Sequence, residues 1–345
     1  MNTFINWLGS SFAPKVAKAM DKKIIRTLSG ALMANVPILL LGSIISIYNL
    51  LAGYVSFLPD LSPVYNFSFG IMSLTLVFLV GYHGAKEYGF KEYGVSTGLI
   101  ALMMFFMVIK PSIADFQFQV AFGRFGGSGM ISAFFAGIVT IVISNLYFKL
   151  HLFEDSVSLP DFLIRWLNQV IPGIIVLVLT TILIYWCNID LFELITKLFS
   201  PLISIGQTYP GFMLCIFIPV FFYSFGINSW FMNPITSPIG LAGITANAAA
   251  FEQGLQPTNI YTSNVTFSVI FIGGMGMTLA LNIMMLKSRS KRIRKFGQIA
   301  MIPSLFNINE PLVYGAPIAL NPILMIPMWI NACLLYTSPS PRDTE

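Results

Sequence analysis

Long runs without a charged residue constrain this chain more than any other feature. Five of them lie before residue 190: Thr27–Pro59, Leu61–Ala85, Tyr93–Ile109, Phe125–Phe148 and Trp166–Ile189. An α-helix needs about 20 apolar residues to cross the hydrocarbon core of a bilayer, and most of these runs are long enough. We therefore predict five membrane-spanning helices, with Tyr93–Ile109 at the short end of the range.

Composition excludes a water-soluble globule. Of 345 residues, 56% are hydrophobic and only 10% are charged, whereas soluble domains carry about 25% charged residues. So few charges cannot coat a surface of this size, and most of the exterior must face lipid. The predicted fold class is all-α: a polytopic transmembrane helical protein with re-entrant hairpins and amphipathic surface helices.

Two basic patches set the predicted topology. Within residues 15–26, four cations fall on one side of a helix and four apolar residues on the other, which indicates an interfacial amphipathic helix or a solvated charge run. The second patch, residues 287–295, has six cations and no acid. Both patches are typical of cytoplasmic segments, so the N-terminus is expected in the cytoplasm and no nucleic-acid partner is predicted.

The second half is harder to divide. The uncharged run Leu198–Phe251 is too long for one helix and must fold back. We predict a surface helix at Asp190–Lys197 and spans at Pro210–Gly226 and Tyr261–Leu286. Residues 228–260 are expected to form a re-entrant hairpin lining a path, or else an ordinary loop outside the membrane. The positions expected to interrupt any regular helix there are Asn233, Pro234, Pro238, Gly240 and Gly243.

These spans leave the topology open. Five early and two later spans make seven crossings, which would put the two basic patches on opposite sides. Either the hairpin region crosses once more, or one span does not cross fully.

The predicted domains are an amphipathic segment (1–26), N-terminal transmembrane helices (27–189), a substrate-binding transport domain (190–332) and a tail (333–345). The tail portion Leu335–Asp343 resembles a translated sequencing adaptor, the alternative being a natural polar terminus. The three cysteines show neither C-x-x-C nor metal-ligand spacing, and neither a metal nor a cofactor is predicted.

Glu310 is the strongest candidate for a functional residue. It is the only charged residue from Phe296 to Pro341, and a carboxylate in such a setting by default faces a cavity and marks a substrate or ion site. Pro311 biases Glu310 away from helical dihedrals, which would leave the Asn307 and Asn309 amides near the carboxylate. Such a cluster suits sugar hydroxyls. The alternative is a structural glutamate in a broken helix.

Three residues at the preceding break complete the candidate site. Asn228 is a second polar group for the substrate, or a local helix cap. Tyr223 or Trp230 offers a flat face to a pyranose ring, or anchors the chain at the membrane interface. No catalytic residue is predicted in this chain, because it lacks H-E-x-x-H, Walker A and G-x-S-x-G motifs.

The segment FNINEPLVYGAPIALNP, residues 306–322, resembles the signature of the membrane-spanning IIC component of bacterial sugar phosphotransferase systems, in the lactose, cellobiose and chitobiose group. The resemblance extends from the amphipathic start to about Ala332. It implies that residues 27–189 form a dimer interface and that the C-terminal half carries the sugar by an elevator-like displacement. Relatives continue for several more spans, so the transport domain is expected to be incomplete.

The resemblance also implies a homodimer in the bacterial inner membrane, with a disaccharide substrate and a cytoplasmic IIB partner whose phosphocysteine supplies the phosphate. Whether the chain itself counts as an enzyme stays open. Glu310 would hydrogen-bond sugar hydroxyls near the atom to be phosphorylated. Relatives often have Trp at the position of Tyr223 and His at that of Asn228, which leaves the sugar open.

Two other classes compete with this interpretation. An ion-coupled secondary transporter of a small polar solute also uses broken helices and a buried carboxylate. A membrane scaffold would bind no sugar. The basic patch at 287–295 either docks the IIB partner or fixes topology.

Overall fold

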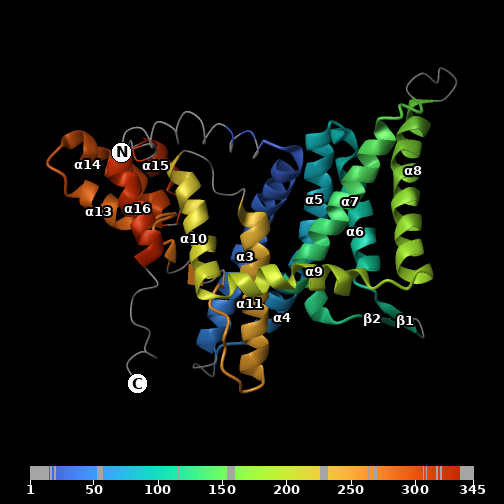
Figure 1. Ribbon diagram of the computed structural model, residues 1–345, viewed down its shortest axis with the longest axis horizontal. Coiled ribbons are helices and arrows are strands. Elements are labelled where there is room, and N and C mark those ends of the chain that lie inside the picture. The colour runs from blue at the N-terminus through green and yellow to red at the C-terminus, as the bar shows by residue number, and fades with distance from the viewer. Residues whose placement is uncertain are drawn as a thin grey trace. The chain divides into compact units, whose positions relative to one another are not determined.

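The computed structural model describes most of the chain, which divides into two units. The described residues are 15, 18, 21–52, 57–114, 117–153, 160–225, 232–262, 265–266, 270–305, 307, 309–315, 318 and 321–334. Most of the predicted amphipathic segment, Asn228, Trp230 and the adaptor-like tail lie outside them. The first unit is Lys22–Pro201, and the second unit combines Met1–Asp21 with Leu202–Glu345 (Figure 1).

The unit Lys22–Pro201 is a bundle whose helices match the five uncharged runs. They are α3 (Lys23–Ala52), α5 (Met72–Tyr88), α6 (Gly94–Val108), α7 (Met130–Phe148) and α8 (Asp161–Thr181), which continues as a π-helical turn, η6 (Ile182–Trp186). Within the described residues, four helical stretches are long and apolar enough to cross a membrane: Ser62–Tyr88, Lys91–Val108, Gly127–Phe148 and Asp161–Trp186. The prediction of several apolar membrane helices in this half is thereby confirmed.

Short elements connect these helices. The one-turn helices are α4 (Ser62–Asn66), η2 (Phe69–Ile71), η3 (Lys91–Tyr93), η4 (Phe122–Phe125) and η5 (Gly127–Gly129). Strands β1 (Ser112–Ala114) and β2 (Gln117–Gln119) pair antiparallel, with Ser112 opposite Gln119.

Small residues let the bundle helices approach closely. Helix α5 packs against α3, α6 and α7 (Figure 1). A Cβ on Gly81 of α5 would lie 2.8 Å from the Gly98 Cα of α6, so the two backbones meet at this glycine pair. Close backbone approach through small residues is a common way for helices to associate in lipid, where no hydrophobic effect drives them together. Phe105, in the last turn of α6, and Ile109, which follows this helix, are fully buried in the resulting core.

An ion pair joins the ends of two helices of this unit. Arg26 Nη2 of α3 lies 2.7 Å from Glu87 Oε2 of α5, and the Lys23 ammonium lies 5.3 Å from the ring centroid of Tyr88. The Arg26 and Glu87 side chains are partly exposed, so the pair is worth at most about 1 kcal/mol. It fixes the register of these ends rather than holding the bundle together.

The second unit is also built mainly from helices. They are the end of α9 (Leu191–Gly206), then α10 (Tyr209–Ser224), α11 (Asn233–Glu252), α13 (Leu279–Leu286), α14 (Lys291–Leu305), α15 (Glu310–Gly315) and α16 (Pro322–Leu334). The predicted surface helix at Asp190–Lys197 is confirmed as a helix but is longer, and it meets α10 at an 88° bend. Its position at the membrane surface stays a prediction.

Helices α10 and α16 pack together and supply much of the second core. The Trp329 indole Nε1 donates a 2.9 Å hydrogen bond to Ser224 Oγ, and its ring lies 5.2 Å from that of Phe221. The Trp329 ring is partly buried, and its N–H finds its partner on α10, so this bond links α16 to α10.

The expected interruption of residues 233–243 is wrong. Helix α11 runs continuously from Asn233 to Glu252. Pro234 lies in the first turn of α11, where a backbone N–H has no intrahelical partner. The proline therefore starts the helix rather than breaking it. Pro238 lies inside α11 and is accommodated there.

The prediction that Tyr261–Leu286 forms one membrane-spanning helix is also wrong. Residues 271–278 form turns and bends, and helix α13 begins only after them, at Leu279. Residues 273–277 instead form tight turns, with positive φ at Gly273 (75°), Gly274 (96°), Gly276 (83°) and Met277 (57°). We call residues 273–277 the glycine turn. Its conformation requires glycine at most of these positions, because positive φ is costly for residues with a Cβ.

Candidate functional site

The Asn307–Glu310 segment forms the turn between α14 and α15. Helix α14 ends at Leu305, and Asn307 has a φ of 61°, in the left-handed region that asparagine tolerates better than most residues. The Asn309 carbonyl accepts a 2.9 Å hydrogen bond from Val313 N and so begins α15. A break at the motif is therefore present, but it lies before Glu310: the expectation that Pro311 keeps Glu310 out of helical geometry is wrong, because Glu310 is the first residue of α15, where a following proline is tolerated.

Asn307 ties this turn to the glycine turn. Its Oδ1 accepts a 2.8 Å hydrogen bond from the backbone N–H of Gly273. The contact joins two segments that both have left-handed backbone, so each turn supports the other.

Asn309 lies at the centre of a buried hydrogen-bond cluster. It is 2% exposed, and its Nδ2 donates 2.8 Å bonds to both the Met275 carbonyl and Thr278 Oγ1. Its Oδ1 accepts a 3.1 Å bond from the hydroxyl of Tyr223, which is 1% exposed. Both amide hydrogens of Asn309 are therefore in use.

The glycine turn is shaped around this side chain. A Cβ on Gly274 would lie 2.3 Å from Asn309 Cγ. Thr278 Oγ1 donates a 2.7 Å hydrogen bond to the Gly273 carbonyl and accepts from Asn309, which closes the cluster. We call Tyr223, Asn307, Asn309, Thr278 and the glycine turn the asparagine cluster.

Three of the six predicted site residues therefore meet: Tyr223, Asn307 and Asn309. Glu310 is the first residue of α15, next to Asn309 in the chain, and its side chain lies outside the described part. Asn228 and Trp230 also lie outside the described residues. Sequence reasoning missed Thr278 and the glycine turn, although the run Gly273-Gly274-Met275-Gly276 was a signal for irregular backbone.

A second set of amide contacts holds the segment that follows α11. Gln207, at the bend between α9 and α10, accepts from Tyr261 N at 2.8 Å and donates to Tyr261 O at 2.9 Å and to Ile239 O at 3.3 Å. A Cβ on Gly243 would lie 2.5 Å from Tyr261 O, so glycine permits this approach. The side-chain amide of Gln207 thus acts like a neighbouring strand.

Asn247 makes a similar contact nearer the end of α11. Its Nδ2 donates to Asn259 O at 2.9 Å, and its Oδ1 accepts from Asn259 N at 2.9 Å. Together the two amides fasten residues 259–261 along α11. The expected hairpin at 228–260 thus takes the form of a helix with an extended return segment, and its place in the membrane stays a prediction.

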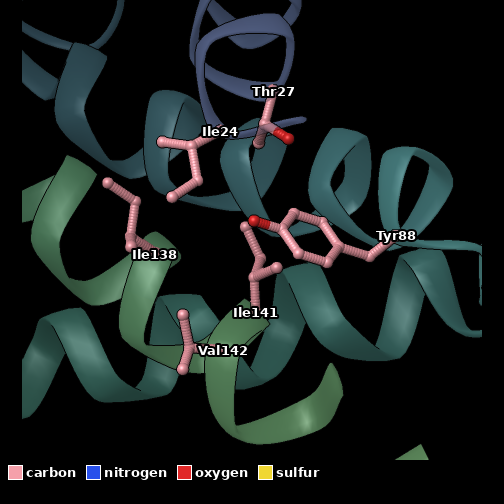
Figure 2. A pocket seen from close by; sticks show the side chains of 6 residues that line it. All are labelled: Ile24, Thr27, Tyr88, Ile138, Ile141 and Val142. Carbon is pink, nitrogen blue, oxygen red and sulfur yellow. The ribbon is translucent and has the colours of Figure 1, made fainter. Parts of the chain in front are cut away.

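A small cavity in the other unit is unsuited to a sugar. Figure 2 shows its lining, which is almost entirely apolar: Ile24, Thr27, Tyr88, Ile138, Ile141 and Val142. Its volume of about 10 Å³ is at the limit for a single water. Among the described residues, no group of three or more His, Cys, Asp or Glu side chains could hold a metal ion.

The fold and this polar cluster define a class of protein: a helical, multi-pass membrane protein with irregular backbone and a glutamate-containing motif in its second unit. The family model of the phosphotransferase system EIIC components matches residues 29–332. The chain belongs to this family and is a sugar-transporting membrane component of a phosphotransferase system.

Individual relatives agree with this assignment. The putative permease IIC component YwbA of Bacillus subtilis is 27% identical, over 98% of this chain and 82% of its own length. The cellobiose-specific EIIC component of Geobacillus stearothermophilus is 28% identical, over 94% and 78%. The lactose-specific EIICB component of Staphylococcus haemolyticus is 25% identical, over 95% and 59%.

The fold has a counterpart among solved structures. The crystal structure of the transporter ChbC, the IIC component of a diacetylchitobiose-specific phosphotransferase system, superposes with a TM-score of 0.80 at 22% identity. The match covers 96% of this chain and 85% of that one. The predicted helical fold class is confirmed.

Proposed function

We propose that this chain binds a β-linked disaccharide of the cellobiose, chitobiose or lactose kind and carries it across the bacterial inner membrane, with its N-terminus in the cytoplasm and as a homodimer. Relatives named for cellobiose, lichenan and lactose support a sugar of this class. The phosphate would come from the phosphocysteine of a IIB partner. That one relative is named an EIICB component supports a partner of this kind.

The observation that carries the proposal is the saturated hydrogen bonding of Asn309. The Nδ2 of this buried side chain donates to Met275 of the glycine turn and to Thr278, and its oxygen accepts from Tyr223. The backbone next to Glu310 is thereby held, which is how a binding carboxylate is preorganised. Glu310 would accept hydrogen bonds from sugar hydroxyls, each worth about 1.5–3 kcal/mol because the acceptor is charged.

The six candidate residues divide by role under this proposal. Glu310, Asn228 and Trp230 would touch the sugar. Asn307, Asn309 and Tyr223 would position Glu310, because their polar atoms bond within the protein in this conformation. Direct contact of the buried Asn309 and Tyr223 with a sugar requires the asparagine cluster to open.

Phosphoryl transfer makes limited demands on such a chain. Catalysis of this step depends on positioning and on stabilising charge at the transferred group. A carboxylate that orients the accepting hydroxyl toward the incoming phosphocysteine would contribute to positioning. The chain would supply binding, orientation and passage, while the partner brings the phosphate.

Vesicles containing the chain test this function against ion-coupled transport. Phosphorylated IIB is supplied on the cytoplasmic face, and radiolabelled cellobiose, lactose or chitobiose on the other. The proposal predicts phosphorylated sugar on the IIB side, at a rate that depends on phosphorylated IIB and not on an ion gradient. Unmodified sugar accumulating with a proton or sodium gradient would refute it.

A further inference from the structure

The exposed face of α14 combines cations and apolar side chains in one row. Lys291, Lys295, Ile299 and Ile302 follow one another at spacings of four, four and three residues, so they lie on the same side of the helix. All four are exposed, and Ile299 and Ile302 are 66% and 68% exposed. We call this row the α14 outer face.

The opposite side of α14 packs against α13. Gly297, Ala300 and Ser304 are buried there, and Asn282 Nδ2 of α13 donates a 3.2 Å bond to Ser304 Oγ. A Cβ on Gly297 would lie 3.0 Å from Met285 Cβ. The rotation of α14 is therefore fixed, and the outer face is a consequence of this packing.

Positive charge at the start of α14 is uncompensated. The first five residues include Lys291, Arg292, Arg294 and Lys295, and no acid lies in the first turn. A helix N-terminus already carries partial positive charge, so these cations raise the local potential further. Arg294 is turned back to donate to Ser288 O at 2.8 and 3.0 Å. Within the described part of the chain, Lys291 and Lys295 lie in no ion pair.

We propose that the α14 outer face binds an anionic phospholipid. Lys291 and Lys295 contact its phosphate, and Ile299 and Ile302 lie about 6 and 10 Å further along the helix axis, at 1.5 Å per residue, against its acyl chain. Clusters of cations beside membrane helices attract anionic lipid at about 1 kcal/mol per cation. A soluble anionic partner would use the cations alone, whereas a lipid also covers the two exposed isoleucines.

Reconstitution in phosphatidylcholine vesicles with a minor fraction of phosphatidylglycerol tests this site. Spin-labelled phosphatidylglycerol and phosphatidylcholine report the fraction of each lipid immobilised by the protein. We expect the wild-type chain to prefer phosphatidylglycerol, and Lys291→Gln/Lys295→Gln to lower that preference by about fivefold or more. Lys86→Gln/Lys91→Gln, which removes two exposed cations elsewhere, is the control and should retain the preference.

A second variant tests the apolar part of the face. Ile299→Ser/Ile302→Ser should also lower retention of phosphatidylglycerol, whereas inorganic phosphate in excess should not displace the lipid from the wild-type chain. An unchanged preference in the lysine variant, or equal losses in variant and control, would overturn the proposal. The proposal would also be overturned if Lys291→Gln/Lys295→Gln kept its preference for phosphatidylglycerol but no longer bound phosphorylated IIB. The α14 outer face would then be a protein-docking surface.

Discussion

The hydroxyl of Tyr223 donates to Oδ1 of Asn309 across 3.1 Å and joins two residues that lie 86 positions apart in the chain. Tyr223 belongs to α10, and Asn309 immediately precedes α15. Both side chains are almost completely buried. This bond connects the two parts of the sequence from which the candidate site was predicted.

Tyr223→Phe should destabilise the protein and slow sugar uptake. The substitution keeps the ring but leaves Asn309 Oδ1 without its tyrosine donor, which costs about 1–3 kcal/mol for a buried acceptor. Unfolding by denaturant in mild detergent measures the loss, and Tyr185→Phe, at a residue 52% exposed, is the control. Equal stability of the two variants would mean that the bond contributes nothing.

Gly274→Ala should be far more damaging than Gly89→Ala. The two glycines have similar φ angles, 96° and 99°, so both substitutions introduce comparable backbone strain. Only at Gly274 does the new Cβ meet another group, Asn309 Cγ at 2.3 Å, whereas nothing lies within 4 Å at Gly89. Gly89→Ala should cost about 1 kcal/mol.

Expression level and thermal unfolding in detergent compare these two glycine variants. We expect Gly274→Ala to lower both well beyond Gly89→Ala and to abolish uptake. Matching behaviour would show that the glycine turn is not packed around Asn309.

Gln207→Leu should loosen the return segment after α11. The substitution removes three hydrogen bonds to the backbone of Tyr261 and Ile239. Hydrogen exchange followed by mass spectrometry should show faster exchange in peptides covering residues 255–262. Gln253→Leu, at an exposed residue at the end of α11, should leave that exchange unchanged. Unaltered protection in Gln207→Leu would contradict the role of this amide.

The sequence predicts the membrane helices well because lipid imposes a strong and local rule. A charge inside a span is costly, so uncharged runs such as Tyr93–Ile109 mark helices directly. The Asn307–Glu310 break was also predictable, since Pro311 and a solitary carboxylate both signal it. These signals lie within a few residues of the feature that they predict.

Other features depend on contacts between distant residues. Pro234 and Pro238 suggested a break, yet α11 is continuous. Pro234 lies at the helix start, where a proline costs little, whereas Pro238 lies inside the helix. The span expected at Tyr261–Leu286 contains the glycine turn, whose geometry is set by Asn309 more than 30 residues later. The partners of Gln207 are equally distant, so no local pattern reveals them.

Binding of cellobiose to Glu310→Gln in detergent, measured by calorimetry, tests the central claim most directly. Glutamine keeps the size of the side chain but loses the charged acceptor, so the account predicts binding at least about tenfold weaker than in the wild-type chain. Glu252→Gln, at an exposed residue that ends α11, should bind as the wild type does. Equal affinity in Glu310→Gln and wild type, with measurable binding in both, would contradict the account.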